Sequence, residues 1–251
     1  MNHFLGIIPA RYASTRFPGK PLALLRNKPM IQWVFERASV SLPHVVVATD
    51  DIRIKEAVEG FGGEAVMTSS NHKTGTERCA EALRLLQKNS LVAFTHVINI
   101  QGDEPLLKQE HLEALKGCFT ERSTQIATLI QPMHCPEDLA NPNVVKVVVD
   151  KSFRALYFSR SPVPFIRITP GEDARSAHPF FTHIGLYAFR AELLQELTRL
   201  PVSPLEKAES LEQLRWLENG YHIQTVITDQ PAVGVDTPED LEKIRNLTDY
   251  S

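Results

Sequence analysis

The first half of the chain alternates continuous apolar runs with stretches that carry apolar residues three or four positions apart. The first pattern is typical of buried strands and the second of helices that pack on a sheet. The strands that it predicts are Phe4–Ile8, Val45–Ala48, Glu64–Met67, Val97–Ile100 and Ile126–Ile130. The helices that it predicts are Pro29–Ala38, Ile52–Gly60, Thr76–Gln87 and Gln109–Phe119. This order predicts an α/β fold with a doubly wound, mostly parallel sheet, which binds ligands beyond the carboxyl ends of its strands.

The second half of the chain follows a different pattern. Val144–Val149 and Ala155–Phe158 are predicted as two strands of a hairpin, and residues 161–181, with four prolines, as a flap. The remaining predicted elements are strands Ile184–Phe189 and Ile223–Ile227 and helices Ala191–Thr198, Pro204–Glu218 and Thr237–Leu247. The last helix has Asp236 or Thr237 as its N-cap. No linker is evident, so we predict a single domain over residues 1–251 with a smaller hairpin and flap subregion at about 141–190.

The composition and charge of the chain disfavour several classes of function. The 251 residues carry a net charge of −3, which disfavours a nucleic-acid-binding protein. We expect no membrane partner, because no apolar run reaches the roughly 18 residues of a membrane span, and no signal peptide opens the chain. Cys79, Cys118 and Cys135 are widely spaced and form no Cys-x-x-Cys pair, which favours reduced thiols in the cytoplasm.

A cationic loop follows the first predicted strand. Arg11, Arg16 and Lys20 lie within ten residues of one another, with Ser14 and Gly19 between them and no acidic residue. Three positive charges at the mouth of a sheet favour an anionic, phosphate-rich ligand. A Rossmann dehydrogenase shares this fold class, but no Gly-x-Gly-x-x-Gly motif follows the strand.

Two aspartates are candidate metal ligands, and each has a simpler interpretation. Asp103 follows a buried strand and a glycine, where a carboxylate suits Mg²⁺, but it also precedes the turn at Pro105. Asp236 begins the sequence Asp-Thr-Pro-Glu, which is a good helix start. Taken alone, each residue is more simply a turn or cap residue.

The motifs of the chain, taken together, resemble those of the 3-deoxy-manno-octulosonate cytidylyltransferases, a family of sugar nucleotidyltransferases also called CMP-Kdo synthetases. The matching segments occur in family order at residues 7–22, 72–78, 101–105, 141–146, 156–160, 183–187, 203–206, 211–215 and 234–241. The first segment is shared by related nucleotidyltransferases, whereas the later ones together are specific to this family. The resemblance implies a nucleotide-diphospho-sugar-transferase-like variant of the Rossmann fold.

The resemblance also implies a reaction. The anomeric hydroxyl of 3-deoxy-manno-octulosonate (Kdo) attacks the α-phosphate of CTP, pyrophosphate leaves, and CMP-Kdo forms for lipopolysaccharide biosynthesis. Arg11 and Lys20 would then hold the CTP phosphates, and Asp103 and Asp236 would hold Mg²⁺; these four are the expected catalytic residues. The expected CTP-binding residues are Ala10, Arg11, Lys20, Thr74, Gly75, Arg78 and Gln101.

Sugar binding and dimerisation are likewise implied by the resemblance. The expected Kdo-binding residues are Arg16, Gln101, Ser159, Arg160, His183, Tyr187 and Glu212. We interpret Arg167 and Arg175, in the flap, as solvated side chains rather than sugar ligands. A homodimer formed through the 141–190 subregion is expected.

Other functions fit the residues less well. A cytidylyltransferase for a related acid, such as an 8-amino-Kdo, would need few changed contacts, whereas the order of the motifs disfavours a sialic acid enzyme. A catalytically silent nucleotide-binding module would be expected to lack the loop lysine or a metal carboxylate, but Lys20, Asp103 and Asp236 are all present.

Overall fold

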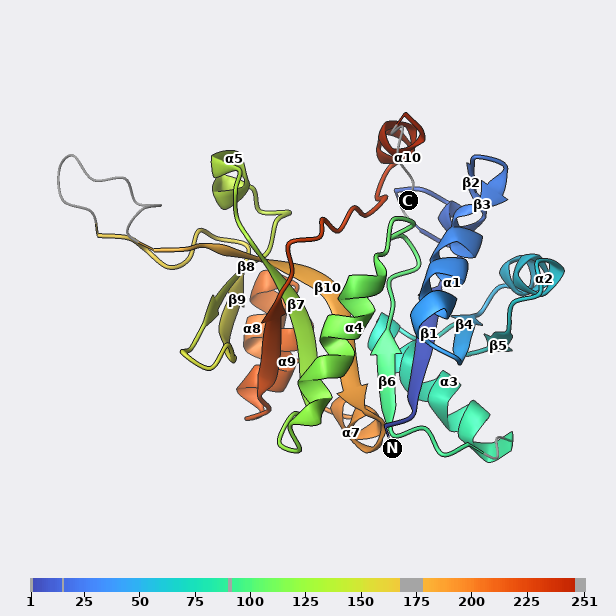
Figure 1. The fold of residues 1–251 in the computed structure, drawn as a ribbon, viewed down its shortest axis with the longest axis horizontal. Coiled ribbons are helices and arrows are strands. Elements are labelled where there is room, and N and C mark those ends of the chain that lie inside the picture. Colours follow the sequence, from blue (N-terminus) through green and yellow to red (C-terminus); the bar gives the residue numbers. More distant parts are fainter. Residues whose placement is uncertain (1, 15, 90–91, 168–177, 247–251) are drawn as a thin grey trace. The chain divides into compact units, whose positions relative to one another are not determined.

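The computed structural model describes residues 2–14, 16–89, 92–167 and 178–246 (Figure 1). The chain divides into two compact units. Unit 1 comprises Met1–Glu113, Ala188–Thr198 and Ala232–Ser251, and unit 2 comprises Ala114–Tyr187 and Arg199–Pro231. One boundary falls within helix α4 (Gln109–Gly117) and another within strand β10 (Phe181–Arg190). That the whole chain folds as a single domain stays a prediction.

Unit 1 is built on parallel strands, as predicted. β1 pairs with β6 on one side and with β4 on the other, and β4 pairs with β5, all in parallel. The bounds are β1 (Phe4–Ala10), β4 (Val45–Thr49), β5 (Ala65–Met67) and β6 (His96–Asn99). β1 continues two residues beyond its predicted end, so that Ala10 pairs with Thr49. The apolar side chains of β1 and β4 are almost fully buried, which explains the continuous apolar runs in the sequence.

Helices cover the strands of unit 1, and both α1 and α3 contact β1. The helices are α1 (Met30–Ser41), α2 (Ile52–Gly60), α3 (Gly75–Asn89), α7 (Ala191–Leu197) and α10 (Pro238–Arg245). Thr237, not Asp236, is the N-cap of α10: its hydroxyl accepts a hydrogen bond from the N–H of Asp240, whose carboxylate accepts one from the N–H of Thr237. The carboxylate of Asp236 is therefore not used as a cap.

A short helix and a small hairpin in unit 1 were not predicted. The 3-10 helix η1 (Lys20–Leu22) follows the cationic loop, and β2 (Leu24–Leu25) pairs with β3 (Lys28–Pro29). These strands are two residues each, too short to produce a period-2 pattern in the sequence.

Unit 2 contains the predicted hairpin. β8 (Lys146–Val149) pairs antiparallel with β9 (Ala155–Ser159) and with β10, while β7 (Ile126–Pro132) pairs in parallel with β11 (Ile223–Ile227). The chain is thus mixed α/β with a mostly parallel arrangement of strands, as predicted. The helix α5 (Pro136–Ala140) and the 3-10 helix η2 (Cys118–Thr120) lie where no separate helix was predicted.

The prediction of one helix over Pro204–Glu218 is wrong. The structure has two, α8 (Pro204–Glu209) and α9 (Gln213–Glu218). The break falls at Ser210, the C-cap of α8, whose φ of 53° lies in the left-handed region. No glycine or proline marks this break, so the sequence favours a continuous helix.

None of the helices in the described ranges combines the length and the apolar character that a membrane span requires.

A buried histidine in unit 1 predicts how stability depends on pH. His96 is 3% exposed, stacks on Phe4, and bonds through Nδ1 to Oγ1 of Thr95 at 2.8 Å. Burial lowers its pKa to about 4. As the pH falls below 6.5, the unfolded chain therefore binds a proton at this histidine, whereas the folded chain stays unprotonated there until the pH approaches 4. The contribution of this residue to stability is complete above pH 6.5 and falls as the pH drops toward 4.

We therefore expect acidification from pH 7 to 4.5 to remove about 2 kcal/mol of the free energy of unfolding through His96. Urea unfolding of His96→Phe at both pH values should show a correspondingly smaller loss than the wild type. His44→Gln alters an exposed histidine of the same unit and is the control. Equal pH slopes for His96→Phe and wild type would contradict the assignment.

Candidate functional site

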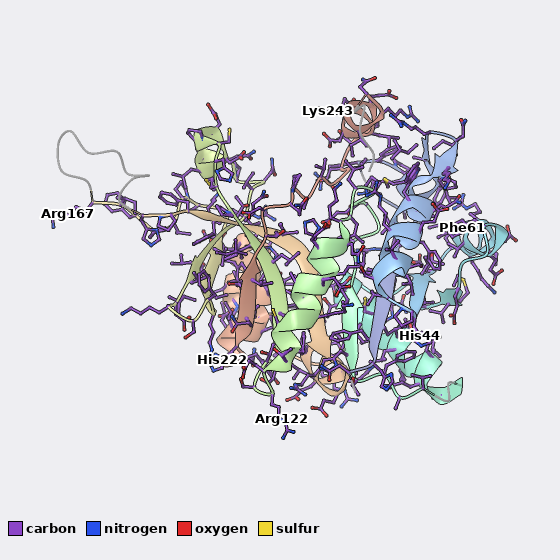
Figure 2. All side chains as sticks on the ribbon, in the orientation of Figure 1. His44, Phe61, Arg122, Arg167, His222 and Lys243 are labelled. Carbon is purple, nitrogen blue, oxygen red and sulfur yellow. The ribbon has the colours of Figure 1, made fainter. Side chains whose placement is uncertain are left out.

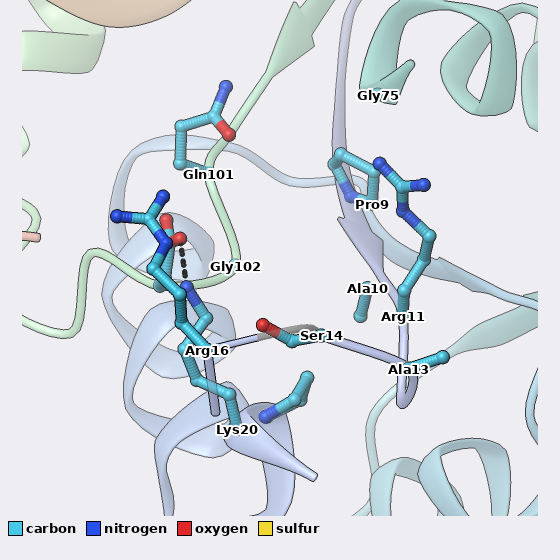
Figure 3. Close-up of a pocket in the computed structure, with 12 residues that line it drawn as sticks. Pro9, Ala10, Arg11, Ala13, Ser14, Arg16, Lys20, Gly75, Gln101 and Gly102 are labelled. Atoms are coloured by element: carbon cyan, nitrogen blue, oxygen red, sulfur yellow. Dashed lines mark hydrogen bonds and ion pairs between the residues drawn. The ribbon is translucent and has the colours of Figure 1, made fainter. Parts of the chain in front are cut away.

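A cavity of about 390 Å³ lies in unit 1 beyond the carboxyl ends of β1 and β6 (Figure 3). Most of the lining belongs to the cationic loop, and the rest comes from the segments that begin α3 and follow β6. The lining residues are Pro9, Ala10, Arg11, Ala13, Ser14, Arg16, Lys20, Pro21, Gly75, Gln101, Gly102 and Asp103. The volume suits a ligand of nucleotide size. The two sequence features predicted to meet at the sheet mouth, the loop and the Gln101–Asp103 segment, therefore line one cavity.

Two glycines allow these segments to approach β1. A Cβ at Gly102 would lie 3.1 Å from the carbonyl oxygen of Pro9, and a Cβ at Gly75 would lie 3.2 Å from the Pro9 ring. Larger residues at either position would push the segment after β6, or the start of α3, away from the cavity wall.

Lys20 is the central cation of the site. Its ammonium lies 2.5 Å from Oδ2 of Asp103 and 3.7 Å from Oδ1 of Asp236, and it donates to the carbonyl of Val235 at 2.8 Å (Figure 3 shows the Asp103 pair). The side chain is only 13% exposed. Gly19, with a φ of 72°, makes the left-handed turn that leads the chain into Lys20.

Asp236 reaches this site from the far end of the chain. Val235, its neighbour, is fully buried in a cluster with Leu25, Met30, Leu241 and Ile244, which packs α10 against the segment that begins α1. The N–H of Val235 also donates to the carbonyl of Asp103 at 2.9 Å. These contacts hold Asp236 beside Asp103, and Nη1 of Arg16 approaches its other oxygen at 3.1 Å.

The donor set suits a hard cation such as Mg²⁺. Two carboxylates converge on the ammonium of Lys20, so their oxygens already lie beside a positive charge. No cluster of three or more His, Cys, Asp or Glu side chains that could hold a metal occurs in the part of the chain that the structure describes. Mg²⁺ accepts such a set, since it commonly takes one or two carboxylates and completes its shell with phosphate oxygens and water.

Glu104 does not add a third charge at neutral pH. Its side chain is 9% exposed, and burial, with the charge of Asp103, raises its pKa to about 8. Asp103 therefore carries the negative charge at this end of the segment.

Arg11 and the turn before α3 form the opposite wall of the cavity. Nη2 of Arg11 donates to the carbonyl of Lys73 at 3.3 Å, and the Arg11 side chain is otherwise exposed. The hydroxyl of Thr74 accepts from the N–H of Glu77 at 3.1 Å, as an N-cap residue does. Gly75 then opens α3, whose N-terminus is electropositive and suited to phosphate oxygens.

The structure gives Arg78 a structural partner that the sequence did not reveal. The side chain is 1% exposed; Nη2 lies 3.0 Å from Oδ2 of Asp50, and Nη1 donates to Oγ1 of Thr68 at 2.7 Å. Arg78 is not among the residues that line the cavity, whereas Ala10, Gly75 and Gln101 are. Asp50, which follows β4, fixes the arginine, and no local pattern links these positions 28 residues apart.

Because Arg78 is buried, we expect Asp50→Asn to lower the free energy of unfolding by about 2–3 kcal/mol. The neutral amide leaves the guanidinium without a counter-charge. Denaturant unfolding measures the change, and the double variant Asp50→Asn/Arg78→Met should regain part of it. A loss of under about 0.5 kcal/mol in Asp50→Asn, typical of exposed pairs, would refute the buried pair.

Three of the predicted sugar residues lie close together in unit 2. Nε2 of His183 is 3.0 Å from Oγ1 of Thr128, and its ring lies 5.2 Å from that of Tyr187. Burial lowers the pKa of His183 to about 3, so the ring is neutral at pH 7. Burial and the charge of Glu212 raise the pKa of Tyr187, which places that carboxylate near the phenol.

Ser159 and Arg160 lie at the end of β9 and are held by Glu209, the last residue of α8. Ser159 Oγ donates to Oε1 of Glu209 at 2.7 Å, and the N–H of Arg160 donates to Oε2 at 2.8 Å. Lys146, whose side chain is fully buried, donates to the carbonyl of Arg160 at 2.5 Å. Sequence reasoning missed the roles of Glu209 and Lys146, because their partners are far away along the chain.

Of the two flap arginines, the structure describes Arg167. Arg167 is exposed and points away from the ribbon of unit 2, in agreement with a solvated side chain (Figure 2). Arg175 lies outside the described residues.

The chain is similar to known cytidylyltransferases over almost its whole length. A cytidylyltransferase family model matches residues 5–226. The 3-deoxy-manno-octulosonate cytidylyltransferase of Parabacteroides distasonis is 54% identical over 97% of this chain and 97% of its own, and that of Phocaeicola vulgatus is 54% identical over 96% and 95%.

Solved structures agree with this similarity. A CMP:2-keto-3-deoxy-manno-octonic acid synthetase complexed with CTP superposes with a TM-score of 0.87 and 42% identity, covering 97% of each chain. A 4-diphosphocytidyl-2C-methyl-D-erythritol synthase from Anaerococcus prevotii, at 13% identity and a TM-score of 0.59, shares the fold.

Proposed function

Since this chain belongs to the 3-deoxy-manno-octulosonate cytidylyltransferase family, we propose that it forms CMP-Kdo and pyrophosphate from CTP and Kdo. The observation that carries the proposal is the position of Lys20 in a nucleotide-sized cavity, between the carboxylates of Asp103 and Asp236. The charge pattern fits phosphoryl chemistry, in which catalysis consists mainly of positioning and charge stabilisation.

The residues of unit 1 act on CTP in this proposal. Arg11 and Lys20 bind the triphosphate, and Lys20 stabilises the charge that builds on the leaving pyrophosphate. The low exposure of the Lys20 side chain, 13%, strengthens this effect, because solvent screens the ammonium only partly. Arg78, whose side chain is held by Asp50 and Thr68, acts on the nucleotide by fixing the first turn of α3, which begins at Gly75 in the cavity wall. Gln101 contributes from the cavity wall itself.

Asp103 and Asp236 are proposed to hold Mg²⁺. The bound ion would supply Lewis-acid polarisation of the phosphoryl group and help to activate the attacking hydroxyl. Arg16 orients Asp236 through the 3.1 Å ion pair and is also a proposed ligand of the sugar.

The residues of unit 2 recognise the sugar in this proposal. Kdo carries several hydroxyls and a carboxylate, which require many hydrogen bonds and at least one cation. Ser159, His183, Tyr187 and Glu212 supply the uncharged and acidic groups, and Arg160 supplies the cation. The neutral state of His183 gives the ring one donor and one acceptor nitrogen at pH 7.

We also propose that the protein is cytoplasmic and forms a homodimer, in which the two subunits contact each other through the 141–190 subregion. The cytoplasmic location is supported by three free cysteines. The dimer is supported by exposed apolar residues in the β8–β9 hairpin: Phe153 is 41% and Leu156 59% exposed. Light scattering should give twice the 28.2 kDa chain mass for the wild type and a monomer for Leu156→Lys. A wild-type monomer would reject the dimer and leave the reaction untouched.

Pyrophosphate release from CTP, Mg²⁺ and Kdo tests the reaction. We expect turnover with Kdo, a lower kcat/KM with 8-amino-Kdo, and loss of activity when EDTA removes the metal. A preference for 8-amino-Kdo would overturn the substrate, and unchanged turnover in EDTA would overturn the metal. Absence of turnover with any acid, together with CTP binding, would favour a silent binding module.

A further inference from the structure

Glu209 links helix α8 to the end of strand β9 through both oxygens of its carboxylate. Oε1 accepts from the hydroxyl of Ser159 at 2.7 Å and from that of Tyr157 at 3.4 Å, and Oε2 accepts from the N–H of Arg160 at 2.8 Å. Partial burial alone would raise the pKa of Glu209, but these hydrogen bonds outweigh burial and lower it. Glu209 is therefore an ionised acceptor at neutral pH.

The contacts of Ser159 fix the direction of its hydroxyl proton. A hydroxyl has one donor and two acceptor sites. The proton of Ser159 is directed to Glu209, because a carboxylate can only accept, and one lone pair accepts from the N–H of Ser161 at 3.0 Å. The hydroxyl is left with one acceptor site, so a ligand can donate to Ser159 but cannot accept from it.

Arg160 is held at its backbone and at its guanidinium. Nε donates to the carbonyl of Glu209 at 2.7 Å, Nη1 to that of Pro142 at 2.9 Å and Nη2 to that of Ser210 at 3.4 Å. A guanidinium has five N–H groups, so two remain for a ligand. The three acceptors of this guanidinium are neutral backbone carbonyls, so these contacts do not neutralise its charge, which can therefore attract an anion.

We propose that Glu209 is a positioning residue for sugar binding, which sets the donor direction of Ser159 and the place of Arg160. A sugar hydroxyl then donates to Ser159, and an anionic group of the sugar meets the remaining N–H groups of Arg160. This inference rests on the proposed function, which assigns Ser159 and Arg160 to Kdo.

The test is steady-state kinetics of Glu209→Gln in the full chain. An amide has one acceptor oxygen, so it cannot accept from Ser159 and from the N–H of Arg160 in the present arrangement. We expect KM for Kdo to rise about tenfold, with kcat and KM for CTP within about twofold of wild type. Glu218→Gln is the matched control, because Glu218 accepts one N–H, from Leu205 at 3.1 Å, and is expected to behave as wild type.

Further variants separate this inference from the assignment of the sugar residues. In a Ser159→Ala background, the effect of Glu209→Gln on KM for Kdo should shrink, because one shared contact is already absent. If Ser159→Ala and Arg160→Met raise KM for Kdo but Glu209→Gln does not, the positioning role is refuted and the assignment stands. If neither Ser159→Ala nor Arg160→Met changes KM for Kdo, the assignment of these two residues to the sugar is refuted, and the inference about Glu209 is refuted with it. A parallel rise of both KM values with a lower melting temperature would show a merely structural role and overturn the inference.

Discussion

Asp103→Asn should lower kcat for pyrophosphate release by about 10³-fold or more, because the site loses one of its two carboxylates. The fold should survive, since the amide oxygen can still accept from the ammonium of Lys20, and the backbone bond from Val235 to residue 103 does not involve the side chain. This substitution removes the charge and keeps the shape of the side chain, so it separates a role of Asp103 in metal binding from a role in the fold.

The control for Asp103→Asn is Asp229→Asn, which neutralises an exposed acid in unit 2 and should keep wild-type turnover. Circular dichroism melting should place Asp103→Asn within a few degrees of wild type. Isothermal titration should show weaker Mg²⁺ binding in the presence of CTP. Turnover within threefold of wild type would show that Asp103 holds no essential metal.

Lys20→Met should lower kcat by about 10²–10³-fold and raise KM for CTP by about tenfold. Methionine keeps much of the length of the lysine stem but removes the charge that neutralises the triphosphate. It also leaves the carbonyl of Val235 without this donor and the carboxylates of Asp103 and Asp236 without their shared cation. The charge loss affects both binding and the leaving group, so kcat and KM should change together.

Lys28→Met serves as the matched control, because Lys28 pairs with Glu36 and is 41% exposed, away from the lining of the cavity. Lys20→Arg tests whether a positive charge alone is sufficient. The planar guanidinium of arginine does not reproduce the compact ammonium that reaches both aspartates, so this variant should recover only a part of the activity. A Lys20→Met enzyme with wild-type KM for CTP would contradict phosphate binding by this residue.

Most of the strand pattern of unit 1 could be predicted closely, because β1, β4 and β6 are buried parallel strands, which produce continuous apolar runs. The break between α8 and α9 could not, because Ser210 adopts a left-handed conformation that serine seldom takes. The turn of the β2–β3 hairpin depends likewise on positive φ at Arg26 and Asn27, of which only asparagine is a usual signal.

Some residues of the candidate site could likewise be predicted from the sequence, and others could not. The loop cations and the segment at Asp103 were predicted from strand ends, whereas Asp236 was assigned by resemblance only, since a cap is the simpler interpretation of its sequence. The structure explains why this segment fits both a helix start and a site residue. Thr237 is the N-cap of α10, and the carboxylate of Asp236 lies near the ammonium of Lys20. The burial of Arg78 and the role of Glu209 depend on contacts between residues distant in sequence, which no local pattern encodes.

The packing of Val235 against Leu25 and Met30 has a consequence for how the protein is made. The cationic loop is synthesised long before Asp236, so the nascent chain lacks the second carboxylate beside Lys20 until residue 236 has been added. A message truncated before residue 235 would yield a protein without the second carboxylate and without the apolar cluster that seats it. Synthesis through residue 236 is therefore needed to complete the pair of carboxylates beside Lys20.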